Sequence, residues 1–288
     1  MARLSAQVGC VPNVVQALGT DSLGAGFGQS SPGMVPGCSA AAPVPVAWLS
    51  RRPQDVVTIH RRGAVNHDVV ERVRRAIYDT FAGQGYAPSR QQIRDLAAVA
   101  EAQVNEAVAE LAAQHHLALD QSGNVVMAHP FTTVNLGFSV MGERTLWWGG
   151  CAWDSFAIPN LVKDEPSVLV ATTCPACRRP LAWTVRRSGP PEGPEVAHFL
   201  VPMDKAWNDV VYTCSNQRLF CSEHCVQAWL ASTGQAQGYI MDLATLWRLA
   251  SDWYCGRLDS PYQRKDPQSA ADYFRSVGLH GPFWELND

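Results

Sequence analysis

The chain has 288 residues, of which 23 are Lys or Arg and 26 are Asp or Glu, so its formal net charge is −3. This balance argues against a generally nucleic-acid-binding or membrane-surface protein. The sequence has no apolar run long enough to cross a bilayer and no convincing secretory signal, so a cytoplasmic protein is expected. In that compartment its nine cysteines are better explained by metal binding or catalysis than by disulfides.

Residues 1–66 are rich in Gly, Ala, Ser and Pro, which predicts a disordered N-terminal extension and linker. Helical periodicity follows in three segments, and a capping box of Ser89 and Gln92 opens the second of them. A hairpin signal at Ser122 and Gly123 comes next. The three segments span residues 69–81, 89–96 and 104–116. Together these elements predict a winged-helix-like three-helix domain over residues 67–130.

A winged helix can bind DNA or serve only for packing, because fold does not imply function. Arg90 and Arg94 are candidate phosphate contacts, but the third helix carries Glu101, Glu106 and Glu110. A recognition helix would instead carry Arg, Lys, Asn or Gln. A structural role is therefore favoured, and nucleic acid is not an expected partner.

From residue 131 the pattern changes to short strands separated by Pro and Gly clusters, with helical segments near the end. The expected strands are 132–140, 168–173, 181–185, 196–201 and 209–213, and the expected helices are 225–231 and 241–254. An α+β protein is predicted, in which residues 131–288 form a mixed β-sheet domain with flanking helices.

The first chemical feature of this domain is Cys151, which follows Gly149 and Gly150, with Asp154 three residues further on. If the segment after Gly150 is helical, the thiol and the carboxyl share one face and point into one pocket. Aromatic residues surround them, and burial among such groups would raise the pKa of a carboxyl. Cys151 could equally be a small buried hydrophobic residue. The aromatic residues in question are Trp147, Trp148, Trp153 and Phe156.

Two close cysteine pairs follow, Cys174 with Cys177 and Cys221 with Cys225. Two such pairs separated by a few dozen residues are typical of a tetrahedral zinc site, because thiolates are soft ligands. One hypothesis is a structural zinc site built from the four, and the other is a chance CxxC in a cysteine-rich chain. A zinc site of these four cysteines would leave Cys151 and Cys214 free for other chemistry.

A run of motifs in this half of the chain resembles the organomercurial lyases, also called alkylmercury lyases, over roughly residues 67–249. The motifs are the run from Phe131 to Phe138, Cys151-Ala-Trp-Asp154, Cys174 leading to Pro180, and Cys214 ahead of Phe220, Ser222 and Trp229. The most specific part is the Cys-Ala-x-Asp motif with a second cysteine some sixty residues on. The resemblance also implies a winged-helix-like domain ahead of the sheet domain.

The resemblance implies that Cys151 and Cys214 bind the mercury of the substrate, that Asp154 takes part in proton transfer, and that Cys174 has a supporting structural role. Cys177, Cys221 and Cys225 are not part of the family pattern. They could complete the zinc site, or receive mercury as an accessory site.

The expected reaction is protonolysis of a carbon–mercury bond, which yields a hydrocarbon and thiol-bound Hg(II) in mercury detoxification. Soft thiolates select such a metal, and a neighbouring acid supplies the proton. The expected partners are small organomercurial substrates, with cytosolic thiols or a mercuric reductase as the Hg(II) acceptor. No glycine-rich nucleotide motif is present, so no organic cofactor is expected. The alternatives are a winged-helix metal-responsive regulator and a non-catalytic heavy-metal-binding or zinc-binding protein.

Overall fold

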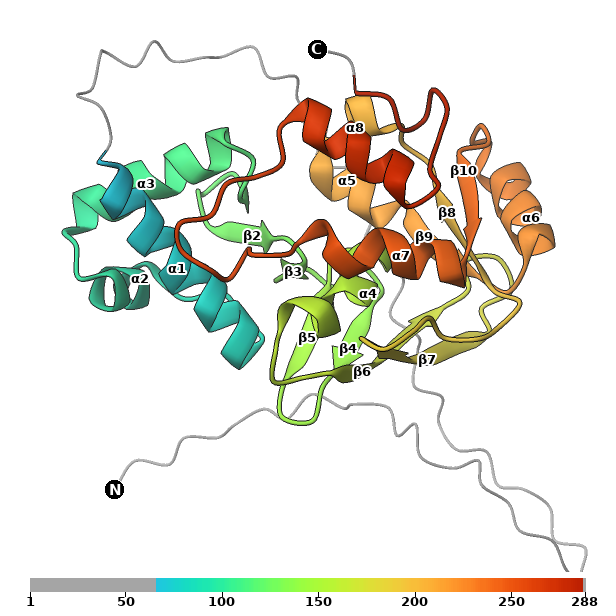
Figure 1. Ribbon diagram of the computed structural model, residues 1–288, viewed down its shortest axis with the longest axis horizontal. Coiled ribbons are helices and arrows are strands. Elements are labelled where there is room, and N and C mark those ends of the chain that lie inside the picture. The colour runs from blue at the N-terminus through green and yellow to red at the C-terminus, as the bar shows by residue number, and fades with distance from the viewer. Residues whose placement is uncertain (1–65, 287–288) are drawn as a thin grey trace, which may run out of the picture. The chain divides into compact units, whose positions relative to one another are not determined.

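The computed structural model describes residues 66–286. The prediction of a disordered extension over residues 1–66 falls outside them except for Asn66. The described chain is α+β: N-terminal helices come first and antiparallel sheets with helices follow, as Figure 1 shows. None of the helices in this described part is long and apolar enough to span a membrane.

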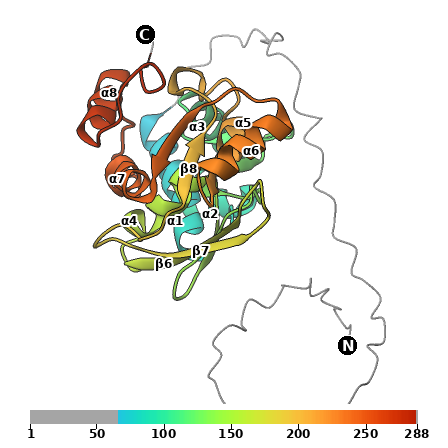
Figure 2. The ribbon, with the colours of Figure 1, turned by 90° about the vertical axis from the view of Figure 1, so that its right-hand side faces the viewer.

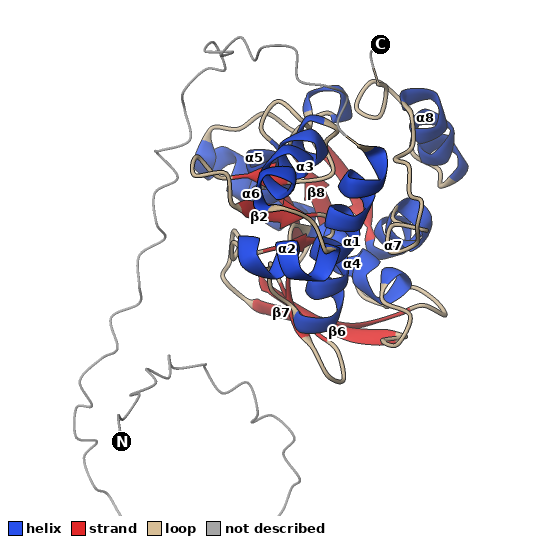
Figure 3. Cartoon of the chain, turned by 90° about the vertical axis from the view of Figure 1, so that its left-hand side faces the viewer, coloured by secondary structure: helices blue, strands red, loops and turns tan. Residues whose placement is uncertain are grey.

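The first three helices are α1 (His67–Gln84), α2 (Arg90–Ala97) and α3 (Glu101–Ala113), and Figure 3 views the molecule from their side. Their ends follow local rules: Ser89 and Gln92 form the expected capping box, and α1 ends at Gly85 with φ of 76°. A side chain at Gly85 would also lie 2.1 Å from the carbonyl oxygen of Leu146. Glycine is therefore required where α1 meets the sheet.

The predicted hairpin is present as β1 (Ala118–Leu119) and β2 (Val125–Ala128). The Asp120 carboxylate closes its turn by accepting hydrogen bonds from the backbone N–H groups of Ser122 and Asn124. The hairpin continues a larger sheet, because β2 also pairs with β3 (Phe131–Thr132). The three helices and hairpin are thus confirmed as elements, whereas a winged-helix domain stays a prediction.

The larger sheet has seven strands in the order β1-β2-β3-β5-β4-β6-β7, and a second sheet has three in the order β10-β8-β9. The remaining strands are β4 (Ser139–Met141), β5 (Leu146–Gly149), β6 (Ser167–Thr173), β7 (Pro180–Arg186), β8 (Val196–Phe199), β9 (Gln217–Phe220) and β10 (Tyr239–Asp242). Each strand pairing of the described residues is antiparallel, so the prediction of a mixed sheet is wrong in this detail. Short turns such as the one joining β6 to β7 permit antiparallel pairing, whereas parallel neighbours require long crossovers.

Three predicted elements also differ from the structure. The strand expected over 132–140 is divided between β3 and β4, and the start of the helix expected over 241–254 belongs to β10. The strand expected over 209–213 is a helix, α5 (Val210–Ser215). Its cause is Asp209, whose carboxylate caps the helix by accepting the backbone N–H of Tyr212 at 2.9 Å. This local cap outweighs the strand preference of Val210 and Val211.

The central helix is α4 (Ala152–Leu161), which packs against α7 (Leu243–Trp253) and against strands of both sheets. Figure 2 shows α4 and α7 on one side of β8 and α6 (Glu223–Thr233) on the other. A short 3₁₀ helix, η1 (Met203–Lys205), precedes α5, and α8 (Pro267–Ser276) follows α7. Phe274 and Trp284 are buried to 2% exposure, so the C-terminal segment docks onto the body through its aromatic residues.

Candidate active site

Cys151 lies where the large sheet passes into the central helix, immediately after β5. It caps α4, and its Sγ accepts the backbone N–H of Asp154 at 3.3 Å. The preceding glycines make this turn possible: a Cβ at Gly150 would lie 2.3 Å from Asp154 Oδ2, and one at Gly149 would lie 2.1 Å from Ser155 Oγ. The helical turn predicted after Gly150 is present, and it directs the thiol and the carboxyl to the same place.

Cys214 reaches this place from α5, sixty residues away in the chain. Its Sγ lies 3.9 Å from Asp154 Oδ2, and its thiol interacts with that of Cys151. All three side chains are buried: Cys151 and Asp154 are 1% exposed and Cys214 is 4% exposed. The structure therefore brings together the three residues to which the resemblance gives a direct part in the reaction, whereas Cys174 lies in a separate group.

Asp154 also contacts a residue that sequence reasoning missed. The hydroxyl of Tyr254, at the end of α7, donates a hydrogen bond to Asp154 Oδ1. Burial raises the pKa of Asp154 from 3.8 to about 7, although the hydrogen bonds from Tyr254 and Cys151 act in the opposite direction. At neutral pH this carboxyl can therefore both give and take a proton.

The two thiols are held in their neutral form in the absence of a bound metal. Burial, the hydrogen bond with Cys214 and the Asp154 carboxylate raise the pKa of Cys151 well above its ordinary value. The hydrogen bond with Cys151 lowers the pKa of Cys214, but burial and Asp154 outweigh it and the pKa is raised. Each sulfur would thus have to lose its proton as it binds a metal ion.

His129 is a second residue that sequence reasoning missed. Its Nε2 lies 3.4 Å from the Sγ of Cys214. Burial lowers the pKa of His129 to about 3, so the imidazole is neutral. His129, Asp154 and Cys214 form a group whose ligand atoms all lie within 4.8 Å of one another. The only sequence signal was a histidine just ahead of the Phe131 run.

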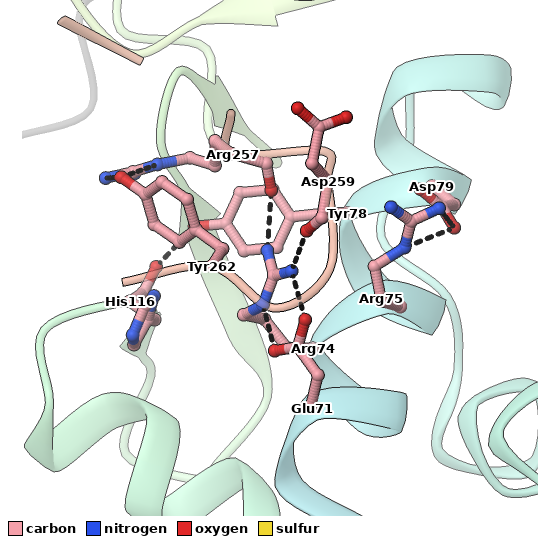
Figure 4. A network of polar contacts seen from close by, with 9 residues as sticks. All are labelled: Glu71, Arg74, Arg75, Tyr78, Asp79, His116, Arg257, Asp259 and Tyr262. Atoms are coloured by element: carbon pink, nitrogen blue, oxygen red, sulfur yellow. Dashed lines mark hydrogen bonds and ion pairs between the residues drawn. The ribbon is translucent and has the colours of Figure 1, made fainter. Parts of the chain in front are cut away.

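Arg257 supports this centre from behind. Its guanidinium donates to the carbonyl of His129 at 2.9 Å and lies 4.6 Å from the centre of the Tyr254 ring. Arg74 of α1 in turn donates to the carbonyl oxygens of Arg257 and Asp259 at 2.5 and 2.6 Å. Figure 4 shows the contacts of Arg74, which tie the first helix to the loop after α7. The N-terminal helices therefore help to position the site.

The centre opens into a cavity of about 450 Å³, enclosed mainly by aromatic and apolar side chains. Its aromatic lining includes Trp153, Trp207, Trp253 and Phe274. Of the four aromatic residues expected around Cys151, only Trp153 is part of this lining. Trp147 instead donates its indole N–H to the carbonyl of Phe81 at 2.8 Å, because β5 turns it toward α1. The cavity can hold a small organic group beside the two thiols.

The second predicted cysteine group is also assembled, apart from the first. Cys174, Cys177, Cys221 and Cys225 have all four Sγ atoms within 4.8 Å of one another, and none of them forms a disulfide. Cys255 is exposed and belongs to neither group.

The family model of alkylmercury lyase (MerB) matches residues 131–255. Residues 131–255 belong to the alkylmercury lyase family. The MerB segment contains Cys151, Asp154 and Cys214, and it ends one residue after Tyr254. His129 and Arg257 lie two residues outside its two ends.

A solved structure described as the mercury-bound form of MerB2 resembles the chain with a TM-score of 0.53 and 18% sequence identity. The similarity covers 68% of this chain and 94% of that structure, and at this identity it shows that the fold is shared. The comparison with curated proteins gives no match.

Proposed function

We propose that the chain is an organomercurial lyase, which cleaves carbon–mercury bonds by protonolysis to give a hydrocarbon and thiol-bound Hg(II). The observation that carries this proposal is the buried Asp154 carboxyl, which lies beside Cys151 and Cys214 and has a pKa raised to about 7. A module that only binds metal needs the thiols but has no use for such an acid. Protonolysis needs both.

In the first step the sulfur of Cys151 displaces the ligand X from a substrate R–Hg–X. The thiol proton leaves with X as HX, and the mercury becomes attached to the protein. The electron-rich sulfur pushes electron density onto the carbon bound to mercury. That carbon then needs a proton before the bond can break.

In the second step the protonated Asp154 carboxyl gives its proton to the carbon, which takes the electron pair of the carbon–mercury bond and leaves as R–H. Cys214 binds the mercury, and its thiol proton restores Asp154. Two thiol protons have then gone into HX and R–H, mercury remains Hg(II), and no external electron donor is required. Asp154 acts as a general acid whose raised pKa suits work near neutral pH.

Release of the metal follows by thiol exchange. Two free thiols take the mercury and return their protons to Cys151 and Cys214, so the enzyme is regenerated. Small cytosolic thiols, or the thiols of a mercuric reductase, would serve as the acceptor. The cavity wall of Trp153, Trp207 and Trp253 suits the organic substituent of the substrate.

The alternative of a DNA-binding metal-responsive regulator gains no support from the helices. Glu101, Glu106 and Glu110 lie along α3, and the β1–β2 hairpin is joined to the main sheet. Arg90, a candidate phosphate contact, donates to Asn105 and to the carbonyl of Gly123. These two contacts, at the surface of the helical part, engage the Arg90 guanidinium within the protein.

The decisive test is the hydrocarbon released into the headspace when the reduced protein meets methylmercury or phenylmercury with excess thiol. We expect methane or benzene from the wild type, none from Cys151→Ser or Cys214→Ser, and unchanged release from Cys255→Ser as the matched control. Asp154→Asn should still bind mercury but should release hydrocarbon at least roughly 100-fold more slowly, the usual scale of general acid catalysis.

Two outcomes would count against the proposal. Unchanged turnover by Asp154→Asn would remove the proton-transfer role. Tight mercury binding by the wild type without any hydrocarbon would favour a protein that only sequesters the metal.

A further inference from the structure

The proposed reaction uses Cys151 and Cys214 and leaves a second set of thiols without a role. These are Cys174, Cys177, Cys221 and Cys225, hereafter the four-cysteine cluster. We propose that the four-cysteine cluster binds one zinc ion, which fastens the large sheet to the small one. The two cysteine pairs would hold the ion whether or not the protein has lyase activity.

The first pair lies in the turn between β6 and β7. Cys174 follows β6 directly, and its backbone N–H donates to the carbonyl of Arg179 at 2.9 Å. Arg178 donates its N–H back to the carbonyl of Cys174 at 3.0 Å and has φ of 63°, in the left-handed region. This tight turn folds the chain back on itself, so that Cys177 lies beside Cys174. The left-handed Arg178 backbone is strained, and it is part of the turn that places the two cysteines side by side.

The second pair lies where β9 passes into α6. Cys221 follows β9, and Ser222 caps α6 by accepting the backbone N–H of Cys225 at 3.4 Å. Both thiols of this pair therefore lie at the N-terminal end of an 11-residue helix. The positive end of the helix dipole stabilises negative charge there, such as that of metal-bound thiolates.

The two pairs meet sulfur to sulfur. Cys177 Sγ and Cys221 Sγ are 3.4 Å apart, and no two of the four sulfurs are farther apart than 4.8 Å. A zinc–sulfur distance of about 2.3 Å in a tetrahedron places the sulfurs about 3.8 Å from one another. The observed range spans this value, so a zinc ion requires only small side-chain movements.

The ligand set selects the metal. Four sulfurs with no oxygen or nitrogen ligand among them favour zinc or iron over magnesium or calcium. Backbone N–H groups of Cys177 and Cys221 also hydrogen-bond to the Cys174 sulfur, which disperses the charge of a bound thiolate. Four protein ligands leave no open position, and such closed zinc sites are structural.

A zinc ion here would connect two segments that lie far apart in the sequence. It would link the β6–β7 turn of the seven-stranded sheet to β9, an edge strand of the three-stranded sheet, and to α6, which packs against β9. The first residue of β9, Gln217, comes three residues after Cys214. The zinc ion would thus hold β9 in place, and the position of Cys214 depends on β9. The ion would not contact the substrate.

The test begins with metal analysis of the full-length protein purified under reducing conditions. We expect about one zinc per wild-type chain, as for a closed tetrahedral site. Cys177→Ser and Cys225→Ser should each lower the zinc affinity roughly tenfold or more, since each removes one of four ligands. Cys255→Ser, which replaces an exposed thiol outside the cluster, should keep its zinc.

A second measurement needs only the wild type, so it stands even where a variant fails to fold. Alkylation followed by peptide mass spectrometry should find the four-cysteine cluster protected when zinc is bound and modified after chelation. Cys255 should be modified in both samples. Cobalt added to the chelated protein should give the intense visible bands of a tetrahedral thiolate site.

Four results would overturn the proposal. The first is a wild type that binds no zinc even after titration with it. The second is a bound iron ion in place of zinc, and the third is mercury retained by the four-cysteine cluster after turnover. Loss of zinc from Cys151→Ser or Cys214→Ser, but not from Cys177→Ser, would likewise assign the ion elsewhere.

Discussion

Tyr254 and Asp154 are joined by a hydrogen bond in which the phenol donates to one carboxylate oxygen and leaves the other directed toward Cys214. The bond fixes the carboxyl between the two thiols. It also lowers the pKa of Asp154, in opposition to burial, so that the pKa is about 7. Tyr254 is therefore a positioning residue for the proton donor.

For Tyr254→Phe we expect slower hydrocarbon release, by roughly tenfold, because the carboxyl loses its orientation. Loss of the hydrogen bond should also raise the pKa of Asp154, so the protonated form should persist to higher pH. The alkaline limb of the pH profile for single-turnover release should shift upward. Tyr273→Phe, on α8 outside the cavity, is the control. If Tyr254→Phe is slower but the alkaline limb of its pH profile does not shift, Tyr254 matters only for packing.

Asp154 should also make the stability of the protein depend on pH. Its pKa rises from 3.8 to about 7 on folding, so the native state holds a proton that the unfolded state has lost. This bound proton contributes to the free energy of unfolding. The contribution is fully present below pH 3.8 and is lost as the pH rises through about 7. The free energy of unfolding of the wild type should therefore fall, relative to that of Asp154→Asn, by about 1.4 kcal/mol per pH unit in this window. Urea denaturation of both proteins at several pH values measures this difference, and parallel curves would contradict it.

Gly150→Ala should damage the site through crowding. The added methyl group would lie 2.3 Å from Asp154 Oδ2 and 2.8 Å from Met127 Cε. We expect a loss of about 1–3 kcal/mol in the free energy of unfolding, together with impaired turnover. Gly83→Ala, whose Cβ would meet nothing within 4 Å, should instead stabilise α1 by about 0.5–1 kcal/mol. Thermal and urea denaturation measure the free energy of unfolding of both variants. Equal changes in Gly150→Ala and Gly83→Ala would show that crowding at Gly150 is unimportant.

The network in Figure 4 offers a matched pair of arginines on one helix. Arg74 is 1% exposed and donates to two carbonyl groups of the loop after α7, whereas Arg75 forms an exposed pair with Asp79. Arg74→Lys should cost about 1–3 kcal/mol, because a buried carbonyl group loses its donor. Arg75→Lys should change stability by less than about 0.5 kcal/mol. Similar melting temperatures for the two variants would show that the buried contacts contribute little.

The parts of the site that the sequence predicts are those set by local rules. Cys151 and Asp154 lie at positions i and i+3 of one helical turn, so their proximity follows once the helix after Gly150 is inferred. The two cysteine pairs are likewise local, one in the turn between β6 and β7 and the other where β9 passes into α6. Asp209 shows the limit of this reasoning, because a cap turned a strand-like run into a helix.

The remaining site residues come together only through tertiary folding. His129 meets Cys214 across 85 residues of sequence, and Tyr254 meets Asp154 across 100. No periodicity or spacing relates such pairs. Arg257 was harder still to foresee, since a buried arginine looks like any surface arginine in a sequence.

The pairing of β2 with β3 has a consequence for anyone who shortens this protein. A chain that began at Phe131 would keep the whole segment matched to the family, yet it would leave β3 as an open edge. Unpaired backbone groups at such an edge recruit other chains, so the truncated protein should aggregate. It would also lose His129, and with it the contact to Cys214. The shortest useful version of this enzyme candidate therefore begins ahead of β2, so that it keeps both this strand and His129.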